Sequence, residues 1–201
     1  MRVRDRFTGA IAGAGSTSGT RIVVGRWDSS PWGPFADVMI EDASGHRVLL
    51  APDERTRDFV IATYVFDEVV LEPVQVTGSA EWHVVTPSLD LTLHVGGRTA
   101  LGALLRGVPP FLATSPVWCA AVDPVARVAL RGVRTRGTAG SGRREWYGAT
   151  SVHAITALGG TWRGAPLGTL ARVDPPCRFG FSSTPARPSV TSLVTTVERE
   201  S

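Results

Sequence analysis

The sequence contains no lysine: its 201 residues include 21 basic residues, and every one of them is arginine. Schiff-base catalysis, attachment of pyridoxal phosphate and the phosphate-binding lysine of Walker-type loops all need an ammonium that can lose or share a proton. Those kinds of chemistry are therefore excluded. Residues 13–20 have glycine spacing similar to a phosphate loop but lack its lysine, so they are predicted to form a flexible turn or a connection between strands.

Cysteine and net charge are also scarce. The two cysteines, Cys119 and Cys177, lie far apart and are predicted to be buried free thiols. The formal net charge of +3 is too small to imply nucleic acid or an anionic membrane as a partner. No run reaches the ~18 apolar residues of a spanning helix, and no apolar signal segment follows the basic start. We expect a cytoplasmic protein with no membrane or nucleic-acid partner.

The amino-acid composition favours a globular chain that is rich in turns. Apolar residues make up 43% and charged residues 19%, with 22 glycines and 14 prolines. One β-rich domain is predicted over residues 1–201. The pattern indicates about ten short strands and helices near 53–64 and 98–108. The predicted fold class is mainly β (α+β): an antiparallel sheet closed into a barrel or sandwich, with one or two short helices packed over it.

One hairpin can be predicted in detail. A two-residue turn at Pro87 and Ser88 places Glu81 opposite His94 and His83 opposite Thr92. In a barrel lumen, Glu81 and His94 would form a catalytic dyad. On a solvent-facing sheet surface they would have no function. His83 and His94, with Glu81 and Asp90 nearby, are also the one metal-capable grouping that the spacing allows. This signal is too weak to predict a metal or a cofactor.

The densest polar cluster lies between residues 127 and 153. In a strand, Glu145 and Tyr147 share one face, so both would point into a lumen as a proton donor and an orienting hydroxyl. The structural alternative is a Glu145–arginine ion pair. Arg134 and Arg136 also share a face and would clamp a carboxylate or phosphate, or else form a solvated strand face.

Aromatic side chains supply the apolar part of the predicted pocket. Trp27, Trp32 and Phe35 flank two prolines in a segment that either covers a barrel mouth or anchors a loop to the core. The predicted ligand-binding side chains are Trp27, Trp32, Phe35, Trp82, Arg134, Arg136 and Trp146.

The functional hypothesis follows from this predicted shape. A barrel of about eight strands can enclose one small ligand. We therefore predict binding of a small, largely apolar organic molecule. Its cofactor-independent conversion, of the isomerase, cyclase or lyase type, would use Glu145, Tyr147, His94 and Glu81. The alternatives are a non-catalytic carrier or sensor, and an interaction or assembly module without a pocket; self-association into a homo-oligomer stays open.

Overall fold

The computed structural model describes residues 2–129, 133–138 and 143–200. Its strands are, in chain order, β1 (Arg2–Ser16), β2 (Arg21–Ser29), β3 (Phe35–Glu41), β4 (Arg47–Ala51), β5 (Glu68–Leu71), β6 (Gln75–Thr77), β7 (Glu81–Val85), β8 (Leu89–Arg98), β9 (Arg136–Thr138), β10 (Arg144–Trp162), β11 (Ala165–Pro166), β12 (Leu170–Ala171) and β13 (Ser189–Glu200). Its helices are α1 (Glu54–Ile61), α2 (Ala100–Arg106), α3 (Pro110–Ala113) and α4 (Pro116–Ala129).

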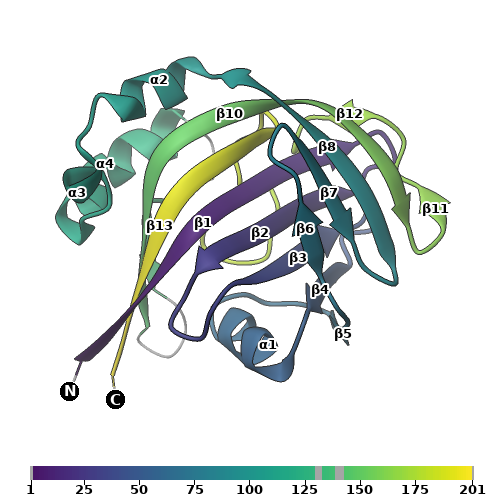
Figure 1. Cartoon of the computed structure of the whole chain (residues 1–201), viewed down its shortest axis with the longest axis horizontal. Coiled ribbons are helices and arrows are strands. Elements are labelled where there is room, and N and C mark those ends of the chain that lie inside the picture. Colours follow the sequence, from purple (N-terminus) through teal and green to yellow (C-terminus); the bar gives the residue numbers. More distant parts are fainter. Residues whose placement is uncertain (1, 130–132, 139–142, 201) are drawn as a thin grey trace.

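The strands belong to one large sheet, which confirms the expected mainly β class (Figure 1). The strand order is β5-β4-β3-β2-β1-β13-β10-β8-β7-β6, with β9, β11 and β12 beside this path. β4 and β5 pair in parallel, and the other described pairs are antiparallel. The two ends of the path, β5 and β6, are joined by Glu72, Pro73 and Val74 but do not pair. The expected closure into a barrel is therefore corrected to an open, strongly curved sheet; Pro73 at this junction has no N–H for a ladder.

The predicted hairpin register is confirmed. β7 and β8 pair Glu81 with His94 and His83 with Thr92, around the turn at Pro87 and Ser88. Trp82 is buried between these polar positions. The alternation of polar and apolar residues was sufficient to predict this register. A shift of the pairing by one residue would have moved the apolar side chains into solvent.

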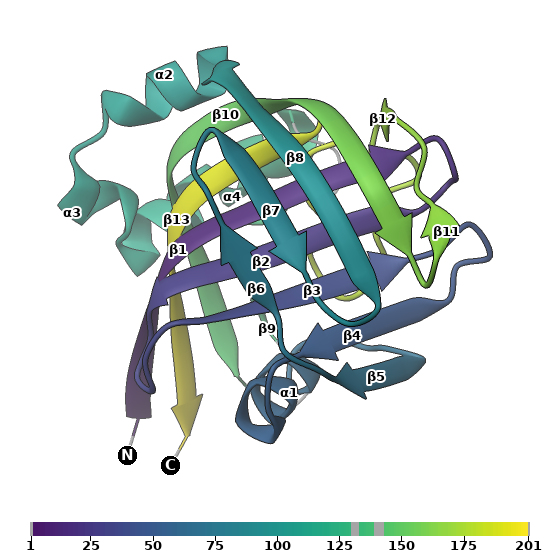
Figure 2. The same cartoon turned by 45° about the vertical axis from the view of Figure 1, so that its right-hand side comes forward.

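The inner face of the curved sheet is filled with apolar side chains. β6, β7 and β8 lie in front of β1, β2 and β3 (Figure 2), so alternate residues of both layers meet. Buried members include Ala12, Ala14, Ile22, Val24, Val38, Ile40, Val48, Leu50, Trp82, Val84, Leu91, Leu93, Ile155 and Val190. The space in which a barrel lumen was expected is thus a packed core.

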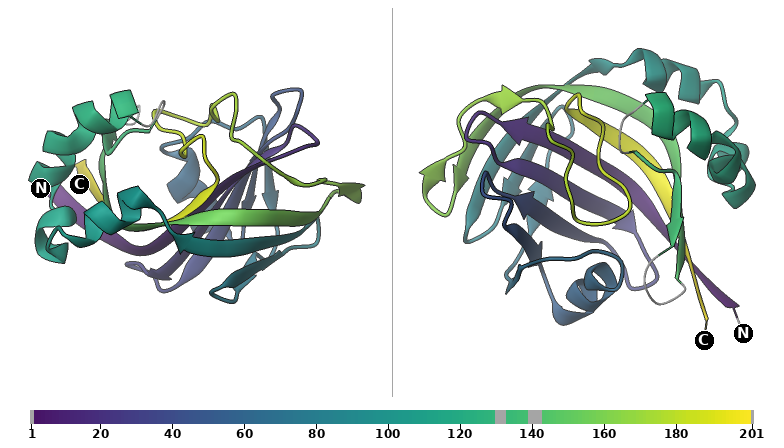
Figure 3. Two further views of the ribbon diagram at one scale, coloured as in Figure 1. Left: turned by 90° about the horizontal axis from the view of Figure 1, so that it is seen from above. Right: turned by 180° about the vertical axis from the view of Figure 1, so that it is seen from behind.

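The opposite face of the same sheet is buried as well. We call residues 172–188, between β12 and β13, the strap; it crosses the rear of the sheet beside α1 (Figure 3). Val23 of β2 packs there against Val173, Cys177 and Phe179 of the strap, with Met39 at the edge. Because both faces are covered, β2 and β3 are nearly continuous runs of buried residues and show little alternation.

The helices differ from the prediction in number. α1 begins where expected, because the Asp53 side chain accepts a hydrogen bond from the Thr56 amide. Thr99 caps α2 in the same way. α3 and α4 are additional to the two expected helices; they begin at Pro110 and Pro116, because proline is tolerated at the first position of a helix.

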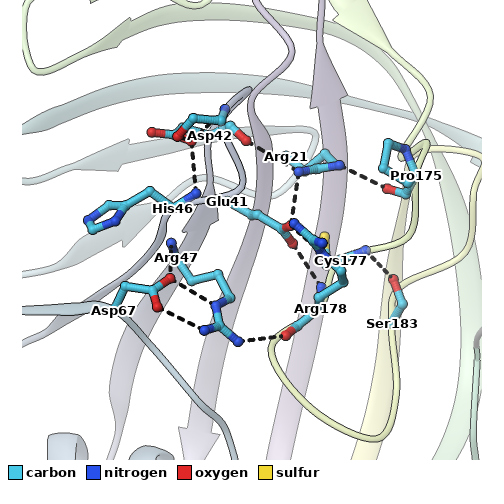
Figure 4. A network of polar contacts seen from close by, with 11 residues as sticks. Arg21, Glu41, Asp42, His46, Arg47, Asp67, Pro175, Cys177, Arg178 and Ser183 are labelled. Atoms are coloured by element: carbon cyan, nitrogen blue, oxygen red, sulfur yellow. Dashed lines mark hydrogen bonds and ion pairs between the residues drawn. The ribbon is translucent and has the colours of Figure 1, made fainter.

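The strap is held to the sheet by a buried carboxylate, Glu41 at the end of β3 (Figure 4). Glu41 is fully buried and pairs with Arg21 at 3.0 Å and with Arg178 of the strap at 2.9 Å. It also accepts the backbone N–H of Arg178 at 2.8 Å. The Arg21 guanidinium donates to the carbonyl of Pro175, also in the strap. Further along, the Val65 amide donates to the Phe179 carbonyl at 2.7 Å.

Replacing Glu41 by alanine should loosen the strap and destabilise the fold. The change leaves the buried Arg21 without its carboxylate, and removal of one partner from a buried pair costs about 3–5 kcal/mol. Urea unfolding measures the loss. Asp67→Ala is the matched control: it breaks the more exposed Arg47–Asp67 pair and should cost at most about 1 kcal/mol. Equal losses in the two variants would contradict a central role for Glu41.

Candidate functional site

Two adjoining cavities lie between the rear face of the sheet, α1 and the strap. The outer cavity has a volume of about 140 Å³ and the inner one about 40 Å³. Side chains common to both walls are Ile11, Val23, Met39, Tyr64 and Tyr147. The outer cavity is closed by strap residues 177, 179 and 182–185 and also contacts Arg134 and Ser189. The inner cavity reaches Trp27, Phe35, Asp37, Phe59, Thr63, Glu145 and Thr195.

A chain of hydrogen bonds runs along the wall that the two cavities share. The Tyr147 hydroxyl donates to Glu145 Oε2 at 2.6 Å, and the Tyr64 and Tyr147 hydroxyl oxygens are 2.5 Å apart. Because the single proton of Tyr147 is engaged by Glu145, Tyr64 is the donor in the second bond. The chain is therefore polarised from Tyr64 through Tyr147 to Glu145.

The Glu145 carboxylate has further partners from two other segments. Thr63, just after α1, donates to Oε1 at 2.6 Å. The Arg143 guanidinium forms an ion pair with Oε1 at 3.0 Å, outside hydrogen-bond geometry, and lies over the Phe59 ring at 4.1 Å. Glu145 is only 3% exposed, so these partners offset the cost of burying its charge. Glu145 therefore forms the ion pair with an arginine that was one of the two expectations, and it also lines a cavity, as the other expectation required.

The two tyrosines of this hydrogen-bonded series remain neutral phenols. Burial, reinforced by the nearby Glu145 charge, raises the pKa of Tyr64 and of Tyr147 well above its usual value of 10. Phe181 of the strap stacks on both rings, with centroids 6.4 Å from Tyr64 and 5.8 Å from Tyr147. The hydroxyls are thus fixed in position as proton-sharing groups of the cavity wall.

A second carboxyl, Asp37 of β3, lies in the inner cavity. Asp37 is 2% exposed, and burial raises its pKa to about 7, against a smaller lowering by a hydrogen bond from Trp27. The Trp27 Nε1 donates to Oδ1 at 3.1 Å, whereas Oδ2 has no hydrogen-bond partner. Unlike Glu145, Asp37 has no ion pair with an arginine in the described part of the chain.

Glycine at position 25 makes room for this carboxyl. Gly25 of β2 is paired with Asp37 in the sheet register. A Cβ atom at Gly25 would lie 2.5 Å from Asp37 Oδ1 and 2.8 Å from Trp27 Nε1. Any larger residue would displace the Trp27–Asp37 hydrogen bond, so the local sequence is fitted to Asp37.

Unsatisfied polar atoms gather around these cavities. Buried polar groups in proteins nearly always have hydrogen-bond partners, and exceptions call for an explanation. Among the described residues, buried side-chain atoms without a hydrogen-bond partner include Asp37 Oδ2, Thr195 Oγ1, Thr184 Oγ1 and Ser189 Oγ. Each of these residues lines one of the two cavities. The walls therefore present polar groups whose partners a bound molecule can supply.

The sequence prediction placed Glu145 and Tyr147 correctly on one strand face, but the face lines the rear cavities and not a lumen. Glu81 and His94 do lie together, with the carboxylate 2.7 Å from His94 Nδ1 and 2.9 Å from His83 Nε2. However, all three side chains are about 40–50% exposed, on the solvent side of the hairpin. This corrects the expectation of a dyad inside a lumen, because the inward positions of the hairpin are the apolar ones.

The predicted ligand-binding residues are divided among several places. Trp27 and Phe35 line the inner cavity, and Arg134 lines the outer one. Trp32 packs on Phe7 and Phe59 as an anchor. Trp82 belongs to the inner-face core, under the guanidinium of Arg26. Arg136 is exposed, and Trp146 pairs with it across β9 and β10, outside the lining of either cavity.

Sequence reasoning missed Asp37, Tyr64, Thr195 and the strap. Asp37 carried a detectable signal, since a carboxyl within the otherwise apolar residues 35–40 demands a partner or a function. Tyr64 follows α1 and gave no local signal. Strap residues such as Ser182 and Thr184 resemble an ordinary loop, and their position depends on Glu41, which is far away in the sequence.

The cysteines and other candidate centres add no chemistry. Both cysteines are free and buried, as predicted. Cys177 lines the outer cavity, but burial raises its pKa to about 12, so the thiol stays protonated. Within the described ranges, no three His, Cys, Asp or Glu side chains are arranged to hold a metal ion. In the same ranges, no helix has the length and apolarity needed to cross a membrane.

The chain matches no protein-family model, no curated protein and no solved structure. Its function therefore has to be argued from the cavities themselves.

The raised pKa of Asp37 predicts that stability falls as pH increases. Between about pH 4 and pH 7 the unfolded chain releases this proton while the folded protein keeps it, so unfolding becomes easier by about 1 kcal/mol per pH unit and then levels off. The other titratable groups lining the inner cavity are Tyr64, Tyr147 and Glu145.

Urea unfolding at several pH values tests this dependence. Asp37→Asn should flatten the slope, since an amide cannot titrate. The control Asp90→Asn, on the exposed side of β8, should retain the wild-type slope. A wild-type slope in Asp37→Asn would contradict the assignment.

Proposed function

We propose that the two cavities bind one small, largely apolar organic molecule and that the protein converts it by acid–base chemistry without a cofactor. The observation that carries this proposal is the coincidence of unpartnered buried polar atoms with adjoining apolar cavities. Cavities with mostly apolar walls and a few convergent polar groups are the usual form of small-molecule sites.

The cavity dimensions limit the ligand. A cavity of about 150 Å³ with apolar walls accommodates benzene, and the outer cavity has about 140 Å³. Its walls include Ile11, Val23, Leu193 and Phe179. The inner cavity, about 40 Å³, has space for only a few further atoms. The expected ligand is therefore a ring or short aliphatic body with one polar end that reaches the inner cavity.

The polar end would meet groups suited to proton transfer. Glu145, Tyr147 and Tyr64 form a hydrogen-bonded chain. Its two tyrosines line both cavities, and Glu145 lines the inner one. Asp37 is a second carboxyl, with a pKa near neutrality. General acids and bases work best when their pKa lies near the operating pH. A simple carrier needs neither this chain nor a buried acid, which favours the enzyme over the carrier.

An assembly module is favoured by a different observation. Leu104, Phe111 and Val117 on α2, α3 and α4 are each more than 70% exposed. Both faces of the sheet are covered, however, so the expected exposed apolar sheet face is not present in the described chain. The assembly module is the second candidate function. The mass of the native protein, as a monomer or as a larger assembly, distinguishes it from the first.

Methionine-methyl NMR tests ligand binding directly. The sequence has only two methionines, Met1 and Met39, and Met39 lines both cavities. Toluene and cyclohexanone, which match the outer cavity in size, should shift the Met39 methyl signal in a saturable way. Native mass spectrometry of the purified protein beside a denatured control would additionally reveal a co-purified ligand.

Ala149→Leu should weaken this binding at least ~10-fold, because the added carbons would occupy outer-cavity volume. Ala157→Leu, the same substitution at an exposed position of β10, is the matched control and should bind as the wild type does. No shift of Met39 with either probe, together with a bare dimer in the native spectrum, would refute the pocket and support the assembly module.

A further inference from the structure

We infer that the inner cavity is a proton-transfer site for small enolisable carbonyl compounds, in which Tyr64 exchanges the oxygen-bound proton and Asp37 exchanges the carbon-bound proton. This inference rests on the proposed function and specifies its substrate class and reaction. It is carried by the geometry of two separate proton-handling groups on one small cavity.

The direction of the hydrogen bonds determines whether the Tyr64 hydroxyl can donate to a ligand or accept from it. Tyr64 donates its own proton toward Tyr147, and Tyr147 donates to Glu145. The remaining lone pair of Tyr64 can therefore accept a hydrogen bond but cannot give one. A ligand hydroxyl fits this end of the chain, and the chain can pass its proton on to the Glu145 carboxylate.

Asp37 supplies the complementary function. Its Oδ2 is buried and has no partner among the described residues, while Oδ1 is held by the Trp27 indole. Burial favours the neutral acid, so below about pH 7 a proton is available for a ligand atom in the cavity. Because the inner cavity has only about 40 Å³, any group that enters it lies close to both Asp37 and Tyr64.

An enol and its ketone differ by the positions that these two groups serve. In one direction the enol O–H bond breaks, its proton enters the Tyr64 chain and its electron pair forms the carbonyl. In the same step the electron pair of the C=C bond takes the proton of Asp37 to form a C–H bond, which leaves Asp37 as a carboxylate and the transferred proton on Glu145. The reverse reaction starts from that state: the Asp37 carboxylate takes the proton from the α-carbon, and the chain returns the Glu145 proton to oxygen. Electrons and protons balance without an oxidant or reductant.

Hydrogen–deuterium exchange at carbon tests this reaction. Cyclohexanone and phenylacetone are incubated with the protein in D₂O, and ¹H NMR follows the loss of their α-proton signals. The wild type should accelerate the loss above the buffer rate. Asp37→Asn and Tyr64→Phe should each reduce the enzymatic rate by about 10²-fold or more, as expected for loss of a general acid–base group. Each variant retains nearly the same shape.

Two controls separate chemistry from binding and folding. Asp90→Asn carries the same change on an exposed strand position and should exchange as the wild type does. Tyr147→Phe leaves both Tyr64 and Asp37 in place but disconnects Tyr64 from Glu145, so it should lower kcat and leave KM within about twofold. A proportional loss of kcat and rise of KM would instead indicate a structural role.

The two proposals can fail separately. If the ketones shift the Met39 methyl signal but exchange only at the buffer rate, binding stands and the proton-transfer inference is overturned. The same conclusion follows if Asp37→Asn and Tyr64→Phe exchange as fast as the wild type. If neither ketone shifts Met39 nor exchanges, the proposed function itself fails.

Discussion

The buried carboxylate of Glu41 is the interaction on which the site depends. It draws Arg21 of β2 and Arg178 of the strap together at the end of β3, and so fixes residues 172–188 across the rear of the sheet. Without the strap, the positions on this face around Val23 and Met39 would form an exposed apolar surface. With it, the sheet has two buried faces, and the second one encloses the cavities. A buried ion pair adds little net stability, so its value here is the position that it imposes.

The two faces of the sheet are used differently. The inner face is filled with apolar, mostly aliphatic side chains. The rear face carries Asp37, Glu145 and the tyrosine pair, together with hydroxyls that have no protein partner. Violations of polar satisfaction in an otherwise well-packed protein are expected at functional sites. Those at Asp37, Thr184, Ser189 and Thr195 line the rear cavities, on the side of the sheet opposite the aliphatic core.

The sequence predicted local features well and long-range ones poorly. The register that pairs Glu81 with His94 and the cap at Asp53 follow from period-two patterning and from capping chemistry, which involve neighbouring residues. The shared face of Glu145 and Tyr147 followed from strand geometry alone. The wall that they form could not be predicted, because it depends on Glu41 reaching Arg178 over 137 positions of sequence separation. The barrel prediction failed for the same reason: alternation identifies strands but does not reveal whether β5 and β6 pair.

The environments of Asp37 and Glu145 explain how two carboxyls on one sheet face can take opposite roles. Glu145 receives hydrogen bonds from Thr63 and Tyr147 and an ion pair from Arg143, so both of its carboxylate oxygens have partners. Asp37 receives only the Trp27 indole, so burial dominates and favours the neutral form. One carboxyl therefore ends a hydrogen-bonded chain, whereas the other, within the described residues, has a free oxygen in the inner cavity. Since Gly25 leaves room for the Trp27–Asp37 hydrogen bond, the environment of Asp37 depends on the pairing of β2 with β3.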